Sequence, residues 1–315
     1  MAQSVLVTAA AGHIGSQLIP QLLKDNVKVV LPTSNASRLR ASYPGQDVAV
    51  EEGSLMNPQW LTDIITKHSV DTIFLCLTGT SELMVTLNVF DVMQRTGVKR
   101  LVYLSGCGDY VSDQGFPKAM EAQSAMHVLV KTFIERKLRH TTYPWTTVRL
   151  GPTLFWDNDL RSKQSILNGL FDEPLGEAGV SRVSTEDIAL AARNAIIDHD
   201  TWAGQKIMVG SQHKYTGTEI AELWTQAIGK DVKILPANEK SFQRFEDDFI
   251  QKAQGGQYGP DAAAWGRDLR LMYEDFSVHG FSMTDEDYNK QVKCLGRPPR
   301  DYKDFVQETA KSWTT

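Results

Sequence analysis

Two glycines near the N-terminus, placed between a short apolar run and an amphipathic segment, constrain this chain more than any other feature. Residues 5–7 are Val-Leu-Val, as expected for a buried strand. Gly12 and Gly15 follow, and apolar side chains then recur at helical spacing from residue 14 to residue 23. A strand, a glycine turn and a helix in this order can hold the pyrophosphate of a dinucleotide. Glycine lets the backbone approach the phosphates, and the helix N-terminus offers free N–H groups.

The first glycine position of the expected G-x-x-G-x-x-G loop is occupied by Ala9. Alanine disfavours a positive φ angle, so a loop that needs one here departs from the full glycine geometry. Alanine is also small, and we therefore expect dinucleotide binding to be retained. The loop residues predicted to bind the cofactor are Thr8, Ala10, Ala11, Gly12, His13, Ile14 and Gly15.

Composition narrows the class of protein. The chain has 315 residues, which can form one large α/β domain or one domain and a smaller partner. Its 42% hydrophobic and 23% charged residues are ordinary for a globular protein. A net charge of −5 without a basic stripe argues against nucleic acid as a partner. The sequence has neither a signal-peptide pattern nor a long apolar run, so we expect a cytoplasmic protein away from membranes. Cys76, Cys107 and Cys294 are widely spaced and fit no metal or disulfide pattern.

Strand-like and helix-like segments alternate through the first half of the chain. The predicted strands are residues 5–7, 27–31, 48–50, 72–77, 100–105 and 145–150, and the predicted helices are residues 14–23, 58–68, 82–96 and 126–138. This alternation predicts an α/β fold with a doubly wound parallel sheet of the Rossmann type over residues 1–150.

The second half is less regular. Helices are predicted over residues 188–197 and 216–228, with Ser184 or Thr185 capping the first, and short strands over residues 205–209 and 232–235. We assign residues 151–315 to a smaller α/β substrate-binding region packed on the first as one body. Phe155, Trp156, Trp265, Met272, Tyr273 and Phe276 are candidates to line an apolar pocket, although each of them can equally pack in a core.

Several motifs, taken in order, resemble the NmrA-like branch of the atypical short-chain dehydrogenase/reductase family. They are the loop Thr8–Gly15, the run Gly97–Ser105 (G-V-K-R-L-V-Y-L-S), the spacing His127-x-x-x-Lys131-x-x-x-Glu135, the run Val148–Pro152, and residues 183–189 and 216–223. The resemblance covers nearly the whole chain. It implies a Rossmann fold that binds NAD(P)H.

Residues after the second predicted strand indicate which dinucleotide is preferred. An acidic side chain there would bind the ribose 2′-OH of NAD and repel the phosphate of NADP. The chain has Thr33, Ser34 and Arg38 instead, so we predict NADP(H); the alternative is that Arg38 lies on a solvated helix face. Leu77, Thr78 and Gly79, after the fourth strand, are predicted to pass along the cofactor.

His127 and Lys131 are candidates for the catalytic centre. The resemblance places them in the register of the superfamily's Tyr-x-x-x-Lys pair, with histidine in the place of tyrosine. Lys131 is predicted to bind the nicotinamide ribose, and His127 to act as a general acid, unless it only packs and hydrogen-bonds. Further candidates near the carboxyl edge of the sheet are Ser105, Asp109, Tyr110 and Glu121.

Two functions fit these observations. The first is an NADPH-dependent oxidoreductase acting on a bulky hydrophobic small molecule, in a natural-product tailoring step that is a reduction or a rearrangement with bound cofactor. The second is a non-catalytic NADP(H) sensor that binds a transcription factor or another protein. An enclosed apolar pocket favours the enzyme, and an exposed protein-binding face favours the sensor. The oligomeric state is left open.

Overall fold

The computed structural model describes residues 3–78, 81–109, 111–122, 125–142, 145–253 and 261–314. Its main sheet has seven parallel strands in the order β10-β6-β5-β4-β1-β2-β3. The strands are β1 (Ser4–Val7), β2 (Lys28–Thr33), β3 (Val48–Glu52), β4 (Thr72–Leu75), β5 (Arg100–Leu104), β6 (Thr146–Pro152) and β10 (Lys206–Val209). The predicted doubly wound α/β fold is confirmed. The order in which the chain adds strands to the sheet reverses between β1 and β4, and ligands of such folds bind at this switch point.

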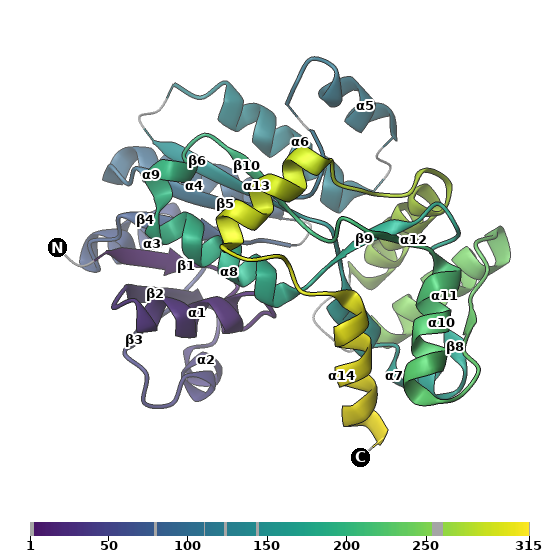
Figure 1. The fold of residues 1–315 in the computed structure, drawn as a ribbon. Coiled ribbons are helices and arrows are strands. Elements are labelled where there is room, and N and C mark those ends of the chain that lie inside the picture. Colours follow the sequence, from purple (N-terminus) through teal and green to yellow (C-terminus); the bar gives the residue numbers. More distant parts are fainter. Residues whose placement is uncertain are drawn as a thin grey trace.

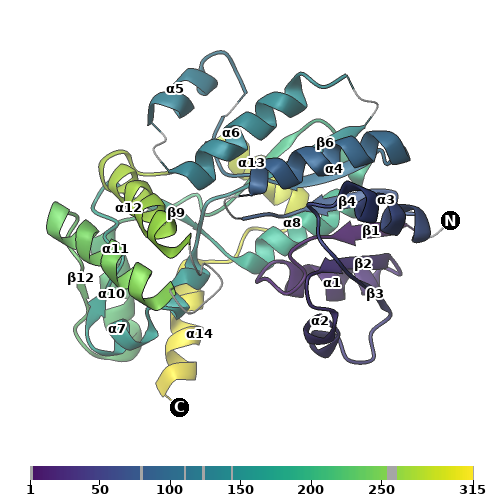
Figure 2. The same ribbon diagram turned by 180° about the vertical axis from the view of Figure 1, so that it is seen from behind.

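Helices cover both faces of this sheet (Figures 1 and 2). One face carries α1 (Gly15–Lys24), α2 (Ala36–Ser42), α8 (Thr185–Ile197) and α13 (Asp285–Leu295). The other face carries α3 (Pro58–Lys67), α4 (Glu82–Thr96) and α6 (Met126–Arg139). Each face has its own apolar core, so the strands are buried on both sides, as their continuous apolar sequences predict.

Local signals set the ends of several helices. Gly97 ends α4 with a φ of 74°, a left-handed conformation that glycine adopts without strain. Ser184 is the N-cap of α8, and its side chain accepts a hydrogen bond from the Glu186 N–H. Thr216 and Glu219 form a reciprocal capping box at the start of α10 (Gly217–Ile228).

The main sheet extends beyond the domain boundary that we drew at residue 150. Strand β10, which we placed in the substrate-binding region, pairs with β6 and is the edge of the main sheet. Helices α8 and α13 also come from the second half and pack on the same face as α1. The reason is physical: strand pairing joins segments distant in sequence, and nothing local marks residues 206–209 as a partner of β6.

The rest of the second half forms a smaller unit with a third apolar core. Its elements are β7 (Leu154–Phe155), η1 (Trp156–Leu160), α7 (Lys163–Leu167), β8 (Leu170–Phe171), β9 (Val180–Val183), β11 (Lys214–Tyr215), α10, β12 (Lys233–Ile234), α11 (Glu239–Ala253), α12 (Ala262–His279) and α14 (Tyr302–Thr314). Two short helices complete the described fold: α9 (His199–Trp202), and α5 (Gly115–Ala122), which we did not predict. No helix among the described residues is long and apolar enough to cross a membrane.

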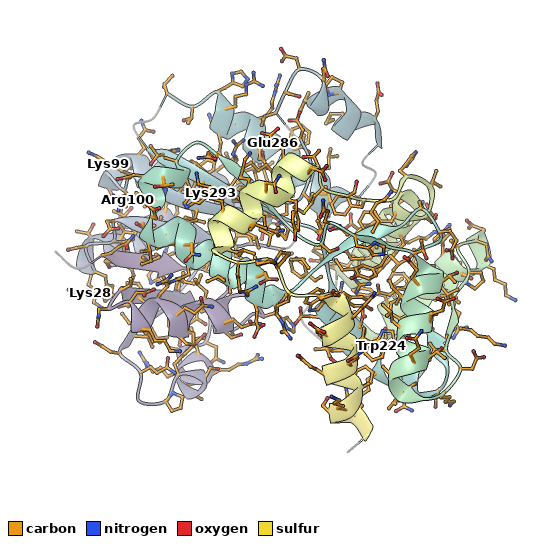
Figure 3. The ribbon with its side chains drawn as sticks, viewed as in Figure 1. Lys28, Lys99, Arg100, Trp224, Glu286 and Lys293 are labelled. Atoms are coloured by element: carbon orange, nitrogen blue, oxygen red, sulfur yellow. The ribbon has the colours of Figure 1, made fainter. Side chains whose placement is uncertain are left out.

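The smaller unit faces the carboxyl edge of the main sheet. Figure 3 labels Lys28 and Arg100, which begin β2 and β5 and therefore mark the amino edge. Trp224, labelled on the opposite side of the molecule, belongs to the core of the smaller unit. The carboxyl ends of the strands thus point towards the second unit.

A fully buried ion pair stabilises the smaller unit. Arg182 on β9 donates to Asp159 in η1, Tyr302 on α14 donates to the same carboxylate, and all three residues are 0% exposed. Burial raises the pKa of Asp159, and the nearby Arg182 guanidinium opposes that shift. Removing the carboxylate would leave a buried guanidinium without its counter-charge.

We expect Asp159→Ala to lower the free energy of unfolding by about 3–5 kcal/mol, because Arg182 stays buried without its hydrogen-bonded carboxylate. Glu222→Ala, on an exposed position of α10, is the matched control and should change it by less than about 0.5 kcal/mol. Urea unfolding followed by circular dichroism measures both. Equal stabilities for the two variants would contradict this role of the ion pair.

Candidate active site

The loop between β1 and α1 has the glycine-type geometry even at Ala9. Ala9 has a φ of 52°, in the left-handed region, and its carbonyl accepts a hydrogen bond of 2.9 Å from the Gly12 N–H. A Cβ atom on Gly15 would lie 2.4 Å from that carbonyl oxygen, so no larger residue fits there. The departure at Ala9 therefore leaves the shape of the loop intact, but at the expense of backbone strain.

The N-terminus of α1 is open to an anion. Its N-cap residue, Ile14, makes no side-chain capping hydrogen bond, and its first turn contains no acidic residue. Ala11 and His13 are exposed in the loop above it, whereas Ala10, Ile14 and Gly15 are buried and Gly12 is half-buried. The Tyr43 hydroxyl donates to the Ala10 carbonyl over 2.6 Å and fixes the loop from α2.

Thr8 has a different role from the one its motif suggests. Its side chain is 1% exposed. The hydroxyl donates to the Cys76 carbonyl at 2.9 Å and accepts from the Cys76 N–H at 2.8 Å. The Thr8 side chain thus connects the end of β1 to the end of β4 and supports the loop through buried hydrogen bonds.

A carboxylate that sequence reasoning missed lies beside the predicted selectivity residues. Thr33, the last residue of β2, is paired with Glu52, the last residue of β3. The Glu52 carboxylate accepts a 2.8 Å hydrogen bond from the Ala36 N–H. Ser34 and Arg38 are exposed next to it. Only strand pairing brings Glu52 here, because it is 19 residues from Thr33 in the sequence.

Lys131 forms a buried ion pair with an acidic side chain near the carboxyl end of β5. Its ammonium donates to Glu82 at 2.8 Å and lies 3.5 Å from the Leu104 carbonyl. Glu82 is 2% exposed, and its second oxygen, Oε2, has no hydrogen-bond partner among the described residues. Of the predicted segment before α4, Leu77 is half-buried and Thr78 exposed, and Gly79 lies outside the described residues.

These features fit a bound dinucleotide. The uncapped N-terminus of α1 and the crowded Gly15 suit the pyrophosphate. The unpaired Glu82 Oε2 and the nearby Lys131 suit the hydroxyls of the nicotinamide ribose, since a buried acceptor without a partner is costly.

The motif His127, Lys131 and Glu135 forms one polar stripe on α6, and each member has a partner on a different element. His127 Nδ1 contacts the Asp268 carboxylate of α12, and Lys131 contacts Glu82 of α4. Glu135 is 0% exposed. It accepts from Ser105, lies 2.6 Å from the Lys206 ammonium and 3.3 Å from the Arg149 guanidinium.

Ser105 does not face the carboxyl edge as a catalytic serine would. Its side chain belongs to the buried Glu135 cluster, and the residue is 3% exposed. Burial lowers the pKa of Lys206 in the same cluster, with Glu135 opposing the shift, and burial raises the pKa of the neighbouring Cys107 to about 12. We therefore assign Ser105 a structural role: its side chain binds Glu135 in this buried cluster.

Asp109, one of the three remaining catalytic candidates, is engaged in a turn. Asp109 accepts from the N–H groups of Val111 and Ser112 at 3.1 and 3.0 Å. Partial burial favours a higher pKa for Asp109, but these bonds and the Ser112 hydroxyl outweigh it and lower the pKa, which suits a turn and not a proton donor. Glu121 is exposed on α5, and Tyr110 lies outside the described residues.

The aromatic side chains expected around a pocket are packed in a core instead. Trp156 stacks on Phe305 with ring centroids 5.4 Å apart, and Phe276 stacks on Phe281 at 5.2 Å. Met272 and Tyr273 belong to the same core, Phe155 packs against the core of the main sheet, and Trp265 is 5% exposed. Their apolar character therefore reflects the folding of the smaller unit.

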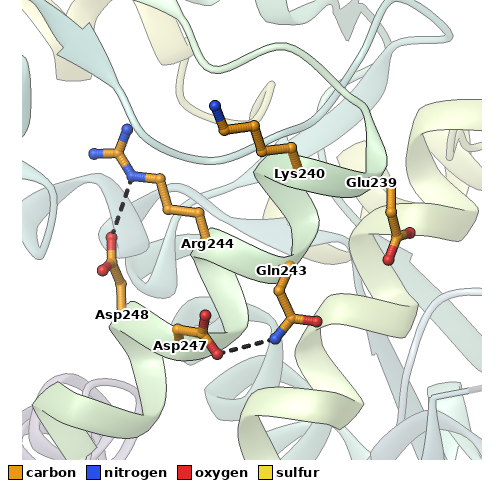
Figure 4. Close-up of a pocket in the computed structure, with 6 residues that line it drawn as sticks. All are labelled: Glu239, Lys240, Gln243, Arg244, Asp247 and Asp248. Carbon is orange, nitrogen blue, oxygen red and sulfur yellow. Dashed lines mark hydrogen bonds and ion pairs between the residues drawn. The ribbon is translucent and has the colours of Figure 1, made fainter.

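A surface hollow along α11 is a poor candidate for a catalytic site. Figure 4 shows its six lining residues, Glu239, Lys240, Gln243, Arg244, Asp247 and Asp248, which all come from that helix. Arg244 pairs with Asp248 at 3.6 Å and Gln243 with Asp247 at 2.9 Å, so the polar groups largely satisfy one another.

The fold and the loop define a dinucleotide-binding protein, and comparison with known families agrees. A family profile described as NAD(P)H-binding matches residues 9–198, more than half of the chain. The chain belongs to this NAD(P)H-binding family. The assignment confirms NAD(P)H as the cofactor and supports the resemblance to the NmrA-like branch of the atypical short-chain dehydrogenases/reductases.

Individual relatives are distant but align over their full length. An NAD(P)H azoreductase from Xenophilus azovorans is 23% identical over 321 residues, covering 98% of this chain and 99% of that protein. The NADPH-dependent quinone oxidoreductase of Escherichia coli, solved with NADPH, has a TM-score of 0.74 at 19% identity, covering 99% and 100% of the two chains. A triphenylmethane reductase from Citrobacter sp. has a TM-score of 0.75 at 19% identity, covering 98% and 99%. These relatives support the prediction of an NADP-dependent oxidoreductase.

We expect Ala9→Gly to stabilise the protein by about 1 kcal/mol, because glycine adopts the left-handed conformation of residue 9 without strain. Ala11→Gly is the matched control in the same loop. Its φ is not positive, so glycine there only adds entropy to the unfolded chain and should destabilise it by about 0.4–1 kcal/mol. Urea unfolding without cofactor distinguishes them, and changes of the same sign would contradict the strain at Ala9.

Proposed function

We propose that this protein is an NADPH-dependent reductase of a bulky, largely apolar small molecule, with His127 as the proton donor. The observation that carries the proposal is the position of His127. Lys131 reaches the carbonyl of Leu104, the last residue of β5, and His127 lies one helical turn, about 5.4 Å, closer to the N-terminus of α6. It therefore lies beyond the carboxyl edge of the sheet, where ligands of open α/β folds bind.

In such a reaction, different residues of the chain would bind the cofactor and donate the proton. NADPH, when bound, supplies a hydride. Lys131 and Glu82 hold the ribose at the end of β4 and β5, and the N-terminus of α1 holds the pyrophosphate. His127 gives a proton to the atom of the substrate that gains negative charge, and regains it from solvent.

The substrate class follows from chemistry and from the relatives' names. Azo groups and quinones are conjugated acceptors that take up a hydride and a proton, and cationic triphenylmethane dyes are conjugated acceptors that take up a hydride alone. We infer a conjugated acceptor of this kind for this protein too. The proposal includes a natural-product tailoring step and a cytoplasmic location. A redox-neutral isomerisation with bound cofactor is the alternative reaction, and it would leave NADPH unconsumed.

A sensor that binds NADP(H) and a protein partner is the second candidate. One observation favours it: Trp156, Tyr273 and Phe276, which we expected to line a pocket, are packed together in the core of the smaller unit. Such a protein binds the cofactor without consuming it, so turnover separates the two functions.

We expect the purified protein to oxidise NADPH in the presence of a quinone or an azo dye from a graded panel. His127→Ala should lower kcat by about 100-fold, because a positioned general acid contributes on that order, and should leave the NADPH Kd unchanged. Absorbance at the NADPH band and fluorescence titration measure the two quantities. Tight NADPH binding without oxidation over the whole panel would favour the sensor.

We expect selectivity for NADPH to be set by Arg38 and opposed by Glu52. Glu52→Gln keeps an acceptor for the Ala36 N–H but removes the charge, so NADPH should bind about two-fold to five-fold tighter. Arg38→Ala should weaken the binding of NADPH by about ten-fold. NADH, which lacks the 2′-phosphate, is the control ligand. If the affinities for NADPH and NADH changed equally, the 2′-phosphate would bind away from Arg38 and Glu52.

A further inference from the structure

The N-terminus of α6 is capped from the other unit of the protein. The N-cap residue of α6 is Ala125, which offers no side-chain hydrogen bond. Instead the Asp268 carboxylate of α12 accepts from the Met126 N–H and, at 3.4 Å, from the His127 N–H. Asp268 is 142 residues from Met126 in the sequence, and its side chain is 4% exposed.

The same carboxylate also holds the imidazole of His127. Oδ1 of Asp268 serves the backbone N–H groups, and Oδ2 contacts Nδ1 of His127. An ionised carboxylate only accepts hydrogen bonds, so Nδ1 carries the hydrogen and Nε2 is the other functional atom of the ring. Within the described ranges, hydrogen bonds reach this ring at Nδ1 and not at Nε2.

The surroundings restrict the ring further. The indole of Trp265, one turn before Asp268 on α12, lies 6.0 Å from the imidazole, with a tilt of 36° between the rings. The His127 side chain is 19% exposed. The ring is therefore held on one side by α12 and still accessible, which is the arrangement needed for a group that exchanges protons with a ligand and with solvent.

We propose that Asp268 is the positioning residue of the proton donor: it fixes the Nδ1–H form and the orientation of His127 and so presents Nε2 to the substrate. This inference rests on the proposed reductase function. In the step itself, the Nε2–H bond of the imidazolium breaks and the proton joins the oxygen or nitrogen of the substrate that has accepted the hydride. The neutral imidazole keeps its hydrogen at Nδ1, facing Asp268, and Nε2 regains a proton from water.

Asp268→Asn tests this role with little change of shape. Asparagine caps helices as well as aspartate, so its carbonyl oxygen still serves the two N–H groups of α6. Its NH₂ group then faces Nδ1 and donates, which forces the neutral ring to carry its hydrogen on Nε2. We expect kcat to fall on the order of 10-fold to 100-fold with an unchanged NADPH Kd, and Asp268→Glu to recover part of the loss.

Nitrogen-15 NMR of the histidines supplies a readout that does not depend on turnover. The His127 signal, identified by its loss in His127→Gln, should show the Nδ1–H form in the parent protein and the Nε2–H form in Asp268→Asn. Asp275→Asn is the matched control, because Asp275 pairs with His279 at 2.9 Å on the same helix, and that histidine is 66% exposed. It should leave kcat and the His127 signal unchanged.

The outcomes separate this inference from the reductase proposal. An unchanged tautomer and an unchanged kcat in Asp268→Asn would overturn the role of Asp268 while leaving the reductase intact. A changed tautomer with no turnover by the parent protein on any acceptor would show that Asp268 fixes the ring but would overturn its role in proton donation. If Asp268→Asn lowered the thermal stability and unfolded α6 but left the tautomer of His127 unchanged, Asp268 would be a helix cap only.

Discussion

Buried charge on α6 is the constraint on which the rest of the site depends. Lys131 and Glu135 point into the protein, where an unpaired charge is costly. Their partners come from the start of α4 and from β6 and β10, so the rotation of α6 about its axis is fixed by several elements at once. His127, one turn before Lys131, lies on the same side of α6 and contacts Asp268 of α12.

The two units of the protein are joined by side chains as well as by the chain. The hydroxyl of Thr185, at the start of α8 in the main-sheet unit, donates a hydrogen bond of 3.1 Å to the Asp157 carboxylate in η1 of the smaller unit. Asp268 reaches from α12 to α6. Because both units contribute to the proposed proton-donor site, neither forms it alone.

Much of the fold was predictable because its signals are local. An apolar strand or a helix end with its cap acts within a few residues, and the strand over residues 5–7 and the helices over residues 82–96 and 216–228 were all as expected. The candidate site was less predictable. Whether Ser105 faces a substrate or a buried glutamate depends on which face of β5 packs against α6, and a single strand sequence does not specify that.

The sequence by itself determined the Rossmann-type alternation of strands and helices, the glycine loop after the first strand, and the placing of His127 and Lys131 on one helix face, since each depends on spacing along the chain. Only the tertiary structure decided what those side chains do. The pairing of β2 with β3 brought Glu52 beside the selectivity residues, and the packing of α12 on α6 brought Asp268 to His127. Both are contacts between distant segments, and packing, not local sequence, selects which segments meet.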